Sequence, residues 1–104
     1  MQIQINTDHH IHGTESLAAH VTGVVEGILS RVSDRITRVE VHLSDENGPK
    51  SGQSDQRCMM EARLAGRKPT AVTHHAATLD LAVEGAAEKL LSSIEHTLGR
   101  LHEH

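Results

Sequence analysis

Short segments of this chain alternate between apolar and polar side chains, and each segment has only one apolar face. In the clearest of them, Val39, Val41 and Leu43 lie on one side, with charged or polar residues on the other. Such alternation predicts strands with one buried and one solvent-exposed face, so a sheet built from them needs a cover on one side only. The segments are residues 1–6, 37–44 and 57–65, with a weaker one at 70–75.

Two longer segments place apolar residues at spacings of three and four, which is typical of one face of a helix. The first follows Thr14, a suitable N-cap, and its apolar stripe covers residues 17–32. The second is expected at about residues 78–100. Gly23 and Gly27 in the first helix either let another backbone approach closely or are simply exposed.

The predicted element order is therefore β-α-β-β-β-α. The helix between the first two strands permits parallel pairing, and the remaining strands can form an antiparallel meander. Because each strand has one apolar face, both helices should cover the same side of the sheet. We predict an α+β fold, a two-layer sandwich with a four-stranded mixed sheet, in a single domain over residues 1–101 with a tail at 102–104.

The composition excludes several classes of function. The chain contains no Phe, Trp or Tyr, so it cannot stack nucleic-acid bases on aromatic rings. Its net charge of −4, from ten Lys/Arg and fourteen Asp/Glu, differs from that of a strongly basic nucleic-acid binder, so any phosphate contact must come from a local patch. We find no nucleophile–base pair, phosphate-binding loop or carboxylate pair, and expect neither catalysis, nor a cofactor, nor a small-molecule substrate.

The single cysteine, Cys58, rules out an internal disulfide and is expected to pack as a small apolar residue. Reduced cysteine favours the cytoplasm. We see no signal-peptide pattern and no segment long enough to span a bilayer, and so expect no membrane association.

Histidines near the first connection raise the question of a metal site. His10 and His12 alternate, Asp8 could join them, and His74 or His75 could approach from the fourth strand. Zinc or nickel accepts such ligands. However, structural zinc usually takes cysteine, and no His-x-x-x-His pair occurs on a predicted helix. We therefore expect a polar connection and no metal.

Four stretches resemble a known family. They are "MQIQIN" at the first strand, "TESL" at the helix start, "DRITRVEVHL" before and within the second strand, and "LDLAVEGAAEKL" in the last helix. In these stretches and in element order the chain resembles the ribosome hibernation-promoting factors and ribosome-associated inhibitors, also called sigma-factor modulation proteins. In the last helix, Glu84, Glu88 and Lys89 match the family's acidic and basic positions, whereas Asp80 replaces its Tyr.

The resemblance implies a domain like the double-stranded-RNA-binding domain and a non-catalytic ligand of the small ribosomal subunit. Family members occupy the channel of messenger and transfer RNA, contacting ribosomal RNA and ribosomal proteins. They stop translation in starved cells and protect idle ribosomes. The family's short members consist of this domain alone.

Candidate RNA contacts are the cations that the predicted fold leaves at the surface. The family's helices are usually rich in Lys and Arg, whereas here the helices contain few. His20 and Arg31 should share one flank of the first helix and Lys89 the equivalent flank of the second, so the two flanks could border a shared groove. The candidates are Arg31, Arg35, Arg38, Arg63, Arg67, Lys68, Lys89 and Arg100.

Two other interpretations stay open. The cations could be ordinary surface residues paired with Asp and Glu. Separately, the chain could be a divergent member of the fold that acts as a protein-interaction or stress module without binding the ribosome, an alternative that the acidic net charge motivates.

Overall fold

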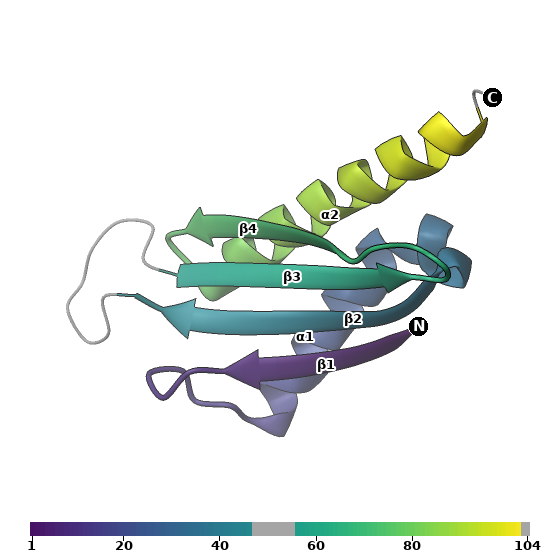
Figure 1. The fold of residues 1–104 in the computed structure, drawn as a ribbon. Coiled ribbons are helices and arrows are strands. Elements are labelled where there is room, and N and C mark those ends of the chain that lie inside the picture. Colours follow the sequence, from purple (N-terminus) through teal and green to yellow (C-terminus); the bar gives the residue numbers. More distant parts are fainter. Residues whose placement is uncertain (47–55, 103–104) are drawn as a thin grey trace.

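The computed structural model describes residues 1–46 and 56–102, of which residues 100–102 are described as backbone only. The elements follow the predicted order, β-α-β-β-β-α, with one short 3₁₀ helix added (Figure 1). They are β1 (Gln2–Thr7), α1 (Glu15–Ile28), the 3₁₀ helix η1 (Ser30–Arg35), β2 (Ile36–Asp45), β3 (Gln56–Leu64), β4 (Thr70–Ala76) and α2 (Leu79–His102).

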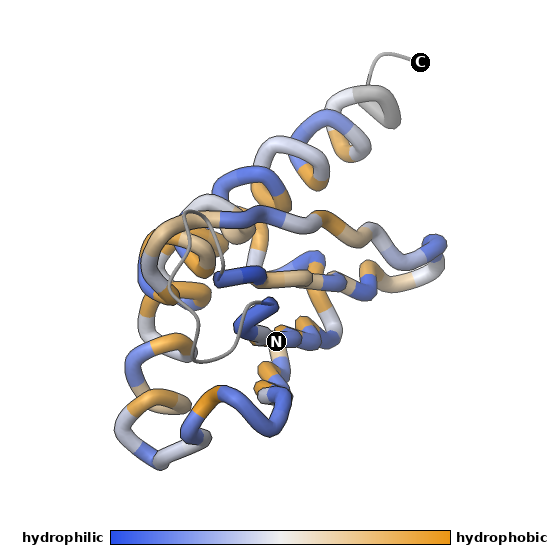
Figure 2. The backbone as a smooth tube through the Cα atoms, turned by 90° about the vertical axis from the view of Figure 1, so that its left-hand side faces the viewer, coloured by the Kyte–Doolittle hydropathy of each residue, from blue (hydrophilic) through white to orange (hydrophobic). Residues whose placement is uncertain are grey.

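The four strands form one mixed sheet in the order β1-β2-β3-β4. β1 pairs in parallel with β2, placing Ile3 beside Val39, whereas β2, β3 and β4 form an antiparallel meander. Both helices lie on the same side of this sheet, as the two views show (Figures 1 and 2). The predicted α+β sandwich is therefore confirmed, and no helix of the described residues covers the other side of the sheet, here called the open face.

The core lies between the sheet and the helix layer and consists of aliphatic residues and methionine. Val39 and Met60 of the sheet are fully buried against Val25 of α1 and Leu90 of α2. Cys58 is also fully buried, and this burial raises the pKa of its thiol to about 12. The prediction that Cys58 packs as an apolar residue is confirmed.

The first helix begins as predicted but ends earlier. The side chain of Thr14 accepts a hydrogen bond from the Leu17 N–H at 3.0 Å, which is the predicted N-cap. The α-helical bonds stop at Leu29, and the apolar stripe continues in η1, where Val32 is buried. The tighter 3₁₀ turn takes the chain from the helix axis to the start of β2 within a few residues. Arg31 therefore belongs to η1 and not to α1.

The loop expected at residues 45–56 lies mostly outside the described residues. Neither α1 nor α2, the α-helices of the described chain, combines the length and apolar character that crossing a membrane would need.

Candidate nucleic-acid interface

Cations from separate segments meet at the end of the sheet where β2 begins and β3 ends. Arg38 and Arg63 lie directly opposite each other on these two strands. Since their neighbours Val39 and Ala62 are buried in the core, both arginines belong to the open face. Arg35 is the last residue of η1, immediately before β2.

The turn between β3 and β4 adds two more cations at the same end. Gly66 has a φ of +72°, a conformation that favours glycine, and the Arg67 N–H then donates to the Leu64 carbonyl at 3.1 Å. This tight turn holds Arg67 and Lys68 at the surface, where both are exposed. We call the set the basic end: Arg35, Arg38, Arg63, Arg67 and Lys68.

Ion pairing leaves much of the basic end available. Arg38 contacts Glu40 at 3.2 Å and also donates to Gln4, and Arg35 lies 3.9 Å from Asp34. The Arg35–Asp34 pair is exposed, and exposed pairs contribute little free energy and are easily exchanged for another anion, whereas the Arg38–Glu40 pair is part-buried. Within residues 1–46 and 56–99, no carboxylate pairs with Arg63, Arg67 or Lys68.

The helix flanks do not form the predicted shared groove. Arg31 pairs with Glu95 of α2 at 3.3 Å, and His20 of α1 contacts Asp80 of α2 at 2.8 Å. The Lys89 ammonium lies on the other flank of α2, where it donates to the Thr73 carbonyl of β4 at 3.0 Å. Arg31 and Lys89 therefore lie on opposite sides of α2, because α2 packs between α1 and β4. The Arg100 side chain is outside the described residues.

The predicted polar connection after β1 is organised by Asp8. Its Oδ1 accepts the N–H groups of His10 and Ile11 at 3.0 and 3.1 Å, and its Oδ2 accepts the Asp45 N–H at 3.2 Å. Burial by itself would raise the pKa of Asp8, but these donors and the nearby His10 outweigh it and lower the pKa below 3.8. Asp8 thus serves as an acceptor for backbone N–H groups.

Asp8 and His10, two of the candidate metal ligands, lie 3.8 Å apart, but the two candidates from β4 have other neighbours. His74 packs against Gly85 of α2, and His75 contacts Glu46 at 3.1 Å. Among the residues that the structure describes, there is no group of three His, Cys, Asp or Glu side chains able to hold an ion.

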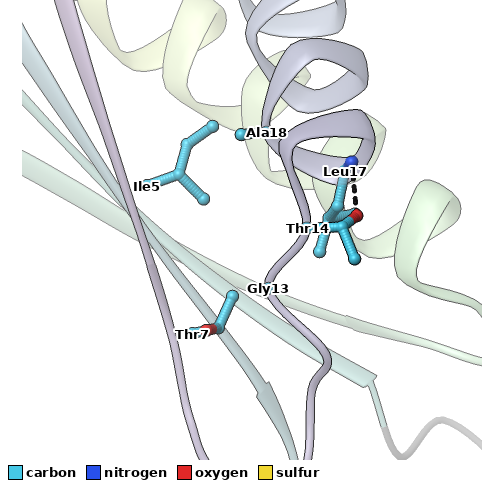
Figure 3. A pocket seen from close by; sticks show the side chains of 6 residues that line it. All are labelled: Ile5, Thr7, Gly13, Thr14, Leu17 and Ala18. Atoms are coloured by element: carbon cyan, nitrogen blue, oxygen red, sulfur yellow. Dashed lines mark hydrogen bonds between the residues drawn. The ribbon is translucent and has the colours of Figure 1, made fainter.

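A small cavity of about 160 Å³ lies between β1 and the start of α1 (Figure 3). The Thr14 hydroxyl in its wall is already bonded to the Leu17 N–H. No lining residue is charged. The lining residues are Ile5, Thr7, Gly13, Thr14, Leu17 and Ala18.

Comparison with known proteins supplies the context for this surface. The family model described as "Sigma 54 modulation protein / S30EA ribosomal protein" matches residues 3–102. No curated protein matches the chain.

Two solved structures share the fold. The N-terminal domain of Protein Y from Thermus thermophilus has a TM-score of 0.67 and 20% identity, over 93% of this chain and 99% of that one. A ribosomal subunit interface protein from Coxiella burnetii has a TM-score of 0.73 and 14% identity, over 95% of this chain and 99% of that one. At these identities the likeness shows the fold alone.

Proposed function

Because the chain belongs to the Sigma 54 modulation protein / S30EA ribosomal protein family, we propose that it is a non-catalytic, ribosome-associated factor of the cytoplasm. In this proposal it binds the small ribosomal subunit in the channel of messenger and transfer RNA. Binding there inhibits translation and promotes ribosome hibernation under stress.

The basic end is the observation that carries the proposal. Its five cations come from four parts of the fold, namely η1, β2, β3 and the β3–β4 turn. Arginine suits this role because its planar guanidinium can make two hydrogen bonds to one phosphate. A net charge of −4 does not prevent such contacts, since exposed charges farther away than about 10 Å are largely screened at 0.1 M salt.

The charge distribution favours contact through this end over contact through the helix flanks. Arg31 already pairs with Glu95, His20 contacts Asp80, and Lys89 is engaged with the β4 backbone. Arg31, Lys89 and Arg100 remain predicted RNA contacts, whereas Arg63, Arg67 and Lys68 are the candidates that would give up no described ion pair on binding.

The test is co-sedimentation of the purified protein with small ribosomal subunits at several salt concentrations. The variant R67Q/K68Q removes two cations from the basic end. Its matched control, S16E/A19E, changes the net charge by the same amount at exposed positions of α1. We expect R67Q/K68Q to weaken binding roughly tenfold or more. Each lost phosphate contact means that fewer counterions are released from the RNA on binding, and this release contributes to the affinity. The control should bind like the wild type.

Two results would contradict the proposal. Equal weakening by both double variants would show that net charge, and not the basic end, determines binding. No co-sedimentation at the lowest salt would favour the alternative, a protein-interaction or stress module. That alternative gains support from the intramolecular pairing of Arg31 and of Arg57, which lies 3.5 Å from Glu46. Adding the protein to a cell-free translation extract tests inhibition separately.

A further inference from the structure

A row of carboxylates adjoins the basic end on the open face. Glu40 lies directly opposite Glu61 across β2 and β3, two residues along each strand from the pair Arg38 and Arg63. Two residues of a strand span about 7 Å. The open face therefore changes from a positive row to a negative row over that distance.

The acidic row has little to neutralise it. Glu40 contacts Arg38 at 3.2 Å, but no residue of the described chain forms an ion pair with Glu61. Its neighbour on β4 is Ala71, and the neighbour of Glu40 on β1 is Gln4. Like charges directly opposite each other destabilise a sheet, a cost that the adjoining Arg38–Arg63 row partly offsets.

We propose that Glu61, together with Glu40, is a specificity-determining residue that confines RNA to the basic end. This inference rests on the proposed function. An RNA backbone that contacts the Arg38–Arg63 row and runs along the strands would place its next phosphates against the carboxylates of Glu40 and Glu61. The screening length is about 8 Å at physiological salt, so the two rows lie within range of each other.

The physical consequence is selection by shape. A flat sheet face with cations at one end would bind any extended polyanion that could lie along it. The carboxylate row penalises that mode of binding. An RNA surface that presents its phosphates to the end of the sheet avoids the row and is penalised less.

The experiment compares E61Q with E84Q. Both substitutions are nearly isosteric and remove one negative charge. Glu84 is exposed on α2 in the helix layer, which covers the opposite side of the sheet. A helix is about 10–12 Å across, so the charge of Glu84 should be largely screened from the open face. The probes are a labelled 20-nucleotide oligouridine, followed by anisotropy, and isolated small ribosomal subunits.

We expect E61Q to bind the oligouridine about threefold more tightly than the wild type, as one charge 7 Å from a phosphate predicts. E84Q should match the wild type, and the gain of E61Q should shrink at high salt. Affinity for the small subunit should rise less than affinity for the oligouridine. Thermal unfolding by circular dichroism confirms that both variants are folded.

Equal gains for E61Q and E84Q would overturn the inference, because the effect would then be one of net charge. Equal gains on the oligouridine and the small subunit would also overturn it, because Glu61 would then give no selectivity. If the wild type fails to bind the small subunit while E61Q alone gains affinity for the oligouridine, the proposed function fails but the repulsive role of Glu61 stands.

Discussion

At the scale of single residues, glycine has different roles in the two helices. A Cβ atom at Gly23 would meet nothing within 4 Å, and the same is true of Gly27, so the interpretation that both are simply exposed is confirmed. A Cβ atom at Gly85 would overlap the imidazole ring of His74. Gly85 is thus where α2 and β4 pack so closely that a side chain does not fit.

The same substitution should therefore have opposite effects at these sites. We expect G23A to raise the free energy of unfolding by about 0.5–1 kcal/mol, because alanine is the better helix former. G85A should lower it by about 1–2 kcal/mol, because overpacking outweighs that gain. Urea denaturation followed by far-UV circular dichroism measures both.

A second substitution checks the cause of the G85A effect. The double variant H74A/G85A removes the ring that the new methyl group would meet, so it should be more stable than expected from the sum of the single changes. If G85A as a single substitution stabilised the protein, as G23A is expected to do, the His74 ring would have to move away at little cost.

At the scale of elements, the connection between β1 and α1 is tied to the end of β2. Besides the side-chain bonds of Asp8, its backbone N–H donates to the Leu43 carbonyl at 3.0 Å. An asparagine at this position has one acceptor oxygen instead of two. In D8N either the Asp45 N–H or the N–H groups of His10 and Ile11 would lose their acceptor.

We expect D8N to lower the free energy of unfolding by about 1–2 kcal/mol at pH 7. The pKa of Asp8 is lowered in the folded state, so its contribution is complete above the unfolded value of 3.8 and is lost as the pH falls through the folded value. The difference between D8N and the wild type should therefore shrink as the pH falls below 3.8 and through the lower folded value.

Thermal unfolding across this pH range is the measurement, with D34N as the control. Asp34 is largely exposed and contacts Arg35 at 3.9 Å, so D34N makes the same chemical change without removing an acceptor that three backbone N–H groups share. A constant gap between D8N and wild type down to pH 2 would contradict the role given to the Asp8 carboxylate.

At the scale of the whole molecule, the charge is unevenly placed. The basic end combines five cations, and the opposite end of the sheet holds Glu46 with its partners Arg57 and His75. Contact through one end predicts a limited number of phosphate contacts.

We expect the logarithm of the small-subunit association constant to fall with the logarithm of salt concentration with a slope of about −3.5, the value for five phosphate contacts on single-stranded RNA. R67Q/K68Q should reduce the steepness of this slope by about 1.4. Titrations at several salt concentrations give both numbers. A slope near −1 for the wild type would show that the basic end does not make these contacts.

The sequence by itself determined the four strands and the two α-helices, their order, the face that each buries and the cap at Thr14. These properties depend on neighbours along the chain, where periodicity and capping are directly visible. The early end of α1 at Ile28 was missed, because the apolar stripe continues through Val32 while the backbone changes to a 3₁₀ turn.

Only the tertiary structure decided which residues of separate elements become neighbours. The pairing of Arg31 with Glu95, the contact of His74 with Gly85 and the register that sets Glu40 opposite Glu61 each join residues from separate elements. Alternation places a residue on a face of its strand, but strand register and helix placement determine its neighbour. The basic end could therefore be predicted as a set of residues but not as a surface.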